Sequence, residues 1–281
     1  QVLIIWKRPL KNGSEIIQSE IEERVKISKM MKETSRTVEI CAGSYQDCLA
    51  AEKGGATRVE LNSALSVGGL TPSVVMLRRV KKETALRVIC MVRPRAAGFC
   101  YDEKDTAVMM EEARLLLENG ADGIAFGFLD EAGAVKEKDT KQMIDLIHSF
   151  GKEAVFHRAF DVTADPYQAM ETLIACGADR VLTSGMQSKA VEGTLLIKEL
   201  QQRYGSQIEI LAGSGVNAEN AETLIKETGI SQVHSSCKSF LHDPTTARGN
   251  VSYAYLSKEH ESDYDVVDAE KVRALVKAVC H

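Results

Sequence analysis

Short apolar runs rich in β-branched residues recur along the chain from residue 37 onward, separated by stretches with helical spacing. Such runs, bounded by turn residues, predict buried strands, whereas apolar positions three or four residues apart predict amphipathic helices. The clearest predicted helices cover 44–53, 104–119, 138–150 and 189–203. The predicted strands cover 37–41, 57–62, 86–92, 122–127, 154–157, 179–184, 208–212 and 231–236.

Eight strands that each precede a helix predict an α/β protein with a (β/α)8 TIM barrel. An internal repeat supports this count, because four similar segments lie before and within every second strand. In each segment a glycine ends a helix and a strand opens at once. A doubly wound open sheet is the alternative, but it does not predict a recurrence at alternate strands. The repeat reads GGATRVEL, NGADGIAF, CGADRVLT and TGISQVHS.

Residues 1–36 differ from the rest of the chain. They are rich in charge, contain the turn sequence KNGS and precede the first clear strand. We expect them to form an N-terminal extension that is partly helical or flexible, with partial helix over 14–33, and we expect residues 37–281 to form the barrel domain.

Polar side chains end several of the predicted strands. In a TIM barrel these ends meet at the mouth, where active sites lie. Side chains two apart on a strand share a face, and the repeat aligns Glu60 with His234, so we place both inward. Strands eight, one and two are neighbours in a closed barrel. We therefore expect Glu39, Cys41, Glu60 and His234 to line one wall and His157 to face them. A hydrogen-bond network that merely fills the barrel is the alternative.

These strand ends also suggest proton transfer and anion binding. Carboxylates and histidine are the usual general acids and bases, and arginine and glycine-rich loops hold anions. Arg93 and Arg95 could instead pair with Glu60 or Asp161. We expect Asn217 to cap the helix after strand seven. The candidate catalytic residues are Glu39, Glu60, His157 and Asp161. The candidate ligand-binding residues are Arg93, Arg95, Arg158, Ser184, Gly213, Gly215 and Ser236.

Composition narrows the class of protein. The formal net charge of −5 argues against nucleic acid or an anionic membrane as the main partner. No apolar stretch approaches the roughly 20 residues of a membrane span. The seven cysteines are an odd number without a C-x-x-C motif, as expected for reduced thiols. We expect a cytoplasmic protein.

The strand-end motifs together resemble the CutC family of copper homeostasis proteins. The resemblance covers residues 37 to about 281 and rests on nine segments in order. They are EICAGS (39–44), RVELN (58–62), GGLTPS (68–73), VRPRAAGFCY (92–101), GADGIAFG (120–127), FHRAFD (156–161), RVLTSG (180–185), AGSGV (212–216) and VHSS (233–236).

This resemblance implies a cytoplasmic TIM-barrel protein, often a homo-oligomer such as a dimer or tetramer, that takes part in copper homeostasis. It also implies a Cu(I) site in which Cys41 is a ligand. The companion cysteine of some family members falls at Asn62 here, so a soft or imidazole partner such as Met91 or His234 would complete the site.

Two functional hypotheses follow. The first is a copper homeostasis protein that binds Cu(I) through Cys41 and His234 at the barrel mouth. The alternative is an enzyme of the lyase, isomerase or hydrolase type that acts on a small anionic or phosphorylated metabolite. The sequence does not decide whether the protein is an enzyme.

Overall fold

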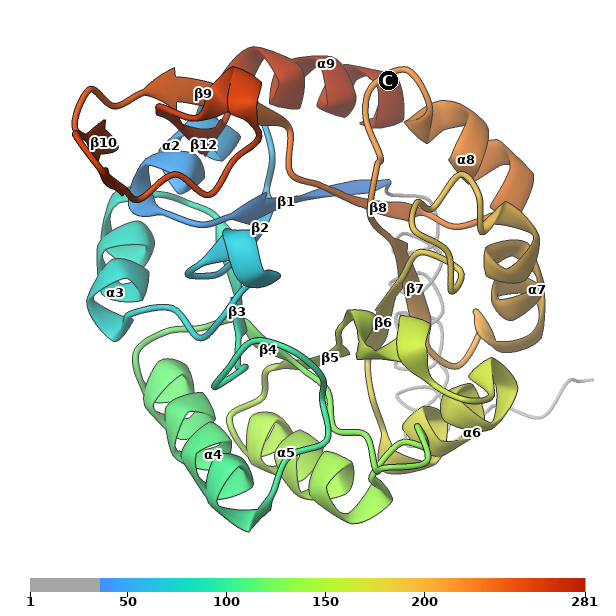
Figure 1. The fold of residues 1–281 in the computed structure, drawn as a ribbon. Coiled ribbons are helices and arrows are strands. Elements are labelled where there is room, and N and C mark those ends of the chain that lie inside the picture. Colours follow the sequence, from blue (N-terminus) through green and yellow to red (C-terminus); the bar gives the residue numbers. More distant parts are fainter. Residues whose placement is uncertain (1–35, 281) are drawn as a thin grey trace, which may run out of the picture. The chain divides into compact units, whose positions relative to one another are not determined.

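The computed structural model describes residues 36–280. The chain separates into two units, Gln1–Arg36 and Thr37–His281. In the second unit, eight parallel strands form a closed barrel in the order β1 to β8. Figure 1 shows these strands as an inner ring enclosed by helices, which confirms the predicted TIM barrel. The prediction of a partly helical or flexible N-terminal extension falls on residues outside the described range.

Each barrel strand is followed by a helix. The strands are β1 (Thr37–Ala42), β2 (Arg58–Leu61), β3 (Arg87–Met91), β4 (Gly123–Phe126), β5 (Glu153–Phe156), β6 (Arg180–Thr183), β7 (Glu209–Ala212) and β8 (Gln232–Ser235). The helices are α2 (Tyr45–Lys53), α3 (Val74–Glu83), α4 (Glu103–Glu118), α5 (Glu137–Ser149), α6 (Pro166–Cys176), α7 (Thr194–Tyr204), α8 (Ala221–Thr228) and α9 (Ala269–Cys280).

The register of β1 decides which side chains meet. This strand pairs with β2 on one side and β8 on the other, so the barrel closes between the first and last strands, as predicted. Cys41 lies opposite Glu60, and Glu39 lies opposite His234. Residues far apart in sequence therefore become neighbours at one wall of the barrel.

The repeat glycines end the helices before β2, β4, β6 and β8. All four adopt the left-handed backbone conformation that glycine tolerates best, with φ between 78° and 96°. The next residues turn directly into the strand. The repeat is therefore structural as well as sequential, and its glycines are Gly55, Gly120, Gly177 and Gly229.

Two apolar layers hold the barrel together. The larger one lies between strands and helices and includes Ile40, Leu61 and Phe126, all fully buried. A small second cluster fills part of the interior with Ile89, Met91, Ala125 and Val155. The repeat aligns Ala125 with Glu60 and His234, whose side chains we expect to point inward.

A network of charged and polar side chains around the buried Arg58 and Arg180 lies at the N-terminal ends of the barrel strands. Arg180 contacts the carboxylates of Glu153 at 3.2 Å and Glu209 at 2.8 Å. The Gln232 amide donates to Glu209 at 2.7 Å, and Arg58 donates to the Gln232 side-chain oxygen at 2.6 Å. We call Arg58, Glu153, Arg180, Glu209 and Gln232 the base network.

The structure differs from the sequence pattern in two places. Helix α7 begins at Thr194 rather than 189, because Gly193 and Glu192 form turn hydrogen bonds with the residues before them. A segment between β8 and α9 adds an antiparallel pair, β9 (Lys238–His242) and β12 (Asp263–Val267), and the short hairpin β10 (Ala247–Arg248) and β11 (Val251–Ser252). Within the described residues, no helix combines the length and apolar character needed to cross a membrane.

Candidate metal and ligand site

A cavity of about 340 Å³ opens at the C-terminal ends of the strands. We call it the mouth cavity. Its lining combines ionisable side chains with apolar ones and with backbone of the loop after β7. The lining residues are Cys41, Glu60, Leu65, Gly68, Met91, Arg93, Phe99, His157, Arg158, Leu182, Ser214, Gly215, Val216, His234, Ser235, Ser236 and Lys238.

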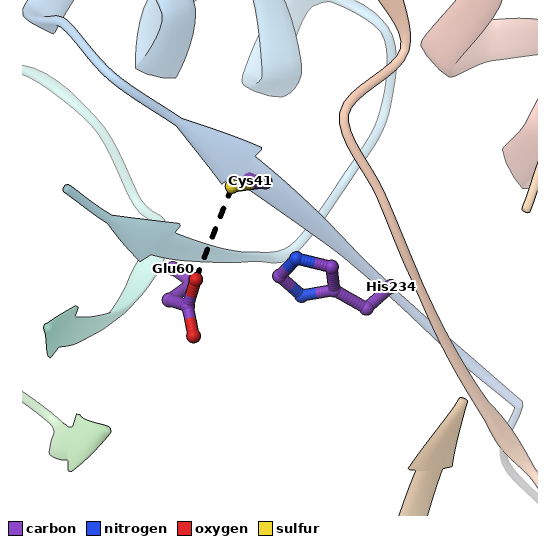
Figure 2. A group of neighbouring side chains, drawn as sticks. All are labelled: Cys41, Glu60 and His234. Atoms are coloured by element: carbon purple, nitrogen blue, oxygen red, sulfur yellow. Dashed lines mark hydrogen bonds between the residues drawn. The ribbon is translucent and has the colours of Figure 1, made fainter. Parts of the chain in front are cut away.

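Three of these side chains form the one group of metal-ligating type found among the described residues. Cys41 on β1, Glu60 on β2 and His234 on β8 offer ligand atoms that all lie within 4.8 Å of one another. Figure 2 shows the three side chains converging, with the His234 ring directed toward Cys41 and Glu60. We call them the metal triad. The Cys41 thiol lies 3.9 Å from Glu60 Oε2.

Glu39 fixes the orientation of the His234 ring from below. Its Oε1 accepts a hydrogen bond from His234 Nδ1 at 2.8 Å, and its Oε2 accepts one from Arg58 Nε at 2.6 Å. Nδ1 is therefore occupied, and Nε2 remains for the triad. Burial raises the pKa of Glu39, but Arg58 and His234 outweigh it and lower the pKa to about 2. Glu39 is thus an ionised partner of His234.

Without a bound metal, the pKa values of all three triad side chains are raised, so each binds its proton more tightly than usual. Burial lowers the pKa of His234, but hydrogen bonds with Cys41 and Glu39 outweigh this and raise it well above its ordinary value. Burial raises the pKa of Cys41 and of Glu60. A metal ion that binds here must displace protons, so its affinity should increase with pH.

Asn62 occupies the space beside Cys41. Its amide nitrogen lies 3.6 Å from Cys41 Sγ and donates to Glu60 Oε2 at 3.0 Å. The amide therefore supplies hydrogen bonds to two members of the triad from the position where the family resemblance would place a second cysteine.

The donor set fits a soft metal ion. A thiolate sulfur and an imidazole nitrogen are ligands that Cu(I) accepts, while the Glu60 carboxylate is a harder ligand. Met91, a further soft side chain, lines the same cavity. Cys41 and His234 are the pair that would hold Cu(I), and Glu60 would add negative charge beside it.

Arg93 and His157 lie in the other wall of the mouth cavity. The Arg93 guanidinium donates to the carbonyls of Val67, Gly69 and Ala97 at 2.6 to 3.0 Å. It pairs with neither Glu60 nor Asp161, the two partners that its position suggested. Burial and the charge of Arg93 lower the pKa of His157 to about 3, so His157 is neutral.

Asp161 and Ser184 form a separate cluster that holds the loop after β6. The Asp161 carboxylate accepts from Arg158 Nε, from the Thr183 hydroxyl and from the Ser184 hydroxyl and amide. Arg158 also donates to the Ser184 hydroxyl at 2.7 Å. Of these side chains, Arg158 alone reaches the mouth cavity. Asp161 thus joins the loop after β5 to the end of β6 and the loop that follows it.

Arg95 has its partners outside the cavity lining. Its guanidinium is exposed, pairs with Asp105 at 2.8 Å and donates to the Cys100 carbonyl. It is absent from the cavity lining within residues 36–280. Of these two arginines, Arg93 therefore lines the mouth cavity and Arg95 does not.

The loop after β7 closes another side of the mouth. Gly215 and Ser236 line the cavity, and Gly213 lies under His234. A Cβ at Gly213 would be 2.7 Å from Leu182 Cδ1 and 3.3 Å from His234 Cβ, so a side chain at this position would require the Leu182 side chain to shift. Asn217 caps the turn before α8 by accepting from the amides of Glu219 and Asn220; the helix itself begins at Ala221.

Three residues of the site carried no assigned role in the sequence interpretation. Arg58 donates to Glu39 and also to the Gln232 side-chain oxygen, and Phe99 packs against both Arg93 and His157. The repeat could have indicated Arg58, because it aligns with Arg180 in RVEL and RVLT. No sequence pattern indicates the contacts of Phe99.

Comparisons with known proteins agree with the geometry. The CutC family model matches residues 36–239. A CutC family protein of Treponema denticola is 43% identical over 86% of this chain and 98% of its own length. The human copper homeostasis protein cutC homolog is 37% identical over 85% of this chain and 87% of its own. A CutC crystal structure from Streptococcus agalactiae superimposes with a TM-score of 0.68 at 31% identity, covering 72% of this chain and 98% of that one. This chain belongs to the CutC family.

Proposed function

We propose that this protein takes part in copper homeostasis in the cytoplasm and binds Cu(I) at the metal triad. The observation that carries the proposal is the convergence of Cys41, Glu60 and His234 within 4.8 Å at the mouth of a CutC barrel. The name of the human relative supports copper as the metal. The thiolate and imidazole supply the soft ligands that Cu(I) prefers.

The surroundings of the triad support a metal site. Glu39 and Arg58 hold the His234 ring from the Nδ1 side, as carboxylates commonly do for metal-ligating histidines. Asn62 holds the Glu60 carboxylate against the Cys41 thiol. The side chains of His234 and Glu60 are thereby oriented before a metal binds.

The test is anaerobic titration of Cu(I) against a competing chelator. We expect about one ion per chain or fewer, and a loss of affinity of about a hundredfold or more in Cys41→Ala and in His234→Asn, because each substitution removes one soft ligand. Cys100→Ala is the matched control, since Cys100 is an exposed free thiol outside the triad. Undiminished affinity in Cys41→Ala would remove this residue from the site.

A further inference from the structure

His157 carries a buried donor without an acceptor. Its Nδ1 accepts a hydrogen bond from the Ala159 amide at 3.1 Å, so in the neutral ring the proton lies on Nε2. Within the described residues, Nε2 has no hydrogen-bond partner. The side chain is 3% exposed and lines the mouth cavity. Buried polar groups normally find partners, so this donor requires an explanation.

Arg93 brings an uncompensated positive charge to the same place. It is 5% exposed, its guanidinium donates to three backbone carbonyls, and no carboxylate of residues 36–280 forms an ion pair with it. The other cationic residues of the lining differ in this respect, because Arg158 pairs with Asp161 and Lys238 with Asp265. Buried charges are usually paired.

Both groups adjoin one side chain. The centroid of the Phe99 ring lies 4.9 Å from the centroid of the His157 ring. The same Phe99 centroid lies 5.2 Å from the Arg93 guanidinium carbon. Phe99 is half-buried, and its neighbours Gly98 and Cys100 are exposed. His157 and Arg93 therefore both pack against the Phe99 ring, which lines the cavity.

We propose that Arg93 and His157 form a binding subsite for the anionic group, carboxylate or phosphate, of a small molecule in the mouth cavity. The His157 Nε2–H donates to an oxygen of this group, and Arg93 supplies the compensating charge. The cavity of about 340 Å³ has room for a metabolite-sized molecule. The subsite does not depend on copper, because neither residue belongs to the metal triad.

Two substitutions of His157 separate the ligand role from the structural one. His157→Asn keeps an acceptor for the Ala159 amide, since asparagine caps well, but removes the Nε2–H donor. His157→Gln places an amide N–H near the former Nε2 and removes the Nδ1 acceptor. The probes are inorganic phosphate and acetate, titrated by calorimetry and by thermal shift at neutral pH. Stronger binding of one probe tells phosphate from carboxylate ligands.

We expect saturable binding of at least one probe to the parent, a loss of about tenfold or more in His157→Asn, and binding within about threefold of the parent in His157→Gln. Arg93→Met should lose about as much as His157→Asn, whereas Arg79→Met, which removes an exposed charge on α3, should bind as the parent does. Neither probe binding to the parent, parent-like binding by His157→Asn, or equal losses in the two arginine variants would overturn the proposal.

Discussion

The base network and the mouth cavity both bury arginine, at opposite ends of the same barrel. At the base, Arg180 faces two carboxylates, and Arg58 faces the Glu39 carboxylate and the Gln232 amide oxygen. In the mouth, Arg93 faces three backbone carbonyls and pairs with no carboxylate of the described residues. Buried arginines thus pair with carboxylates at the base, whereas the buried arginine in the mouth binds backbone carbonyls.

The difference separates two uses of buried polarity. At the base, the compensating charges belong to the chain itself, so removing one partner strands the other in a medium that solvates it poorly. Around Arg93 and His157 in the mouth, the chain's own partners are neutral or absent, so these two side chains can still interact with a molecule that enters. The first arrangement stabilises the fold, and the second is suited to binding.

The largest expected effect is at the base. Arg58→Met should lower the free energy of unfolding by about 3–5 kcal/mol, because it leaves the Glu39 carboxylate buried without its guanidinium partner. Chemical denaturation measures this change. Arg79→Met is the control, since Arg79 pairs with Glu83 on α3, outside the base network, and is 61% exposed, and it should cost less than about 1 kcal/mol. Equal losses in the two variants would show that the base network does not differ from a surface pair.

A smaller effect is expected from a gain of ligand at the triad. Asn62→Cys places a second thiol beside Cys41, where the amide nitrogen now lies 3.6 Å from Sγ. Two thiolates suit Cu(I) better than one, so the Cu(I) affinity should increase by about tenfold or more. Chelator competition measures it, with Asn62→Ser as a control that removes the amide without adding a thiol. An increase in both variants would mean that the amide hinders binding rather than that the thiol aids it.

The smallest expected effects are changes of stability with pH. They should have opposite signs at the base network and at the mouth cavity. Burial raises the pKa of Glu209, but Arg180 and Gln232 outweigh it and lower the pKa overall, so Glu209 contributes stability above its unfolded pKa and loses it in acid. Burial raises the pKa of Glu60, which therefore favours folding while protonated and opposes it once pH rises above the unfolded value.

Glu209→Gln should accordingly make stability less sensitive to pH below about 4.5, by less than about 1 kcal/mol because this side chain is 42% exposed. Glu60→Gln should leave the protein as stable or more stable at neutral pH. Urea unfolding at a series of pH values measures both. A loss of neutral-pH stability in Glu60→Gln would place this carboxylate with the base network rather than with the mouth.

Periodicity and the glycine repeat carried enough information to predict the barrel, because each strand is a local apolar run with a local stop signal. Strand-end position likewise predicted that Cys41, Glu60 and His234 meet, since the repeat and barrel closure together fix their face. These features depend on rules that act along the chain or between adjacent strands.

Side-chain partners were harder to predict, because they depend on loop paths that no periodicity describes. Arg93 could have paired with Glu60 or Asp161, but the loops after β2 and β3 bring carbonyls of Gly69 and Ala97 to it first. The β9–β12 pair was missed for a related reason: its strands are mostly half-buried or exposed, so they lack the apolar run that marks a buried strand.

Barrel closure has a consequence for the order of events during synthesis. Glu39 and His234 are separated by 195 positions, yet they share a hydrogen bond across the seam between β1 and β8. A ribosome that has made β1 through β7 has produced Cys41 and Glu60 but not the histidine. The triad is assembled only when the last strand has emerged and joined the first, so a partly made chain presents the thiol and the carboxylate without the histidine.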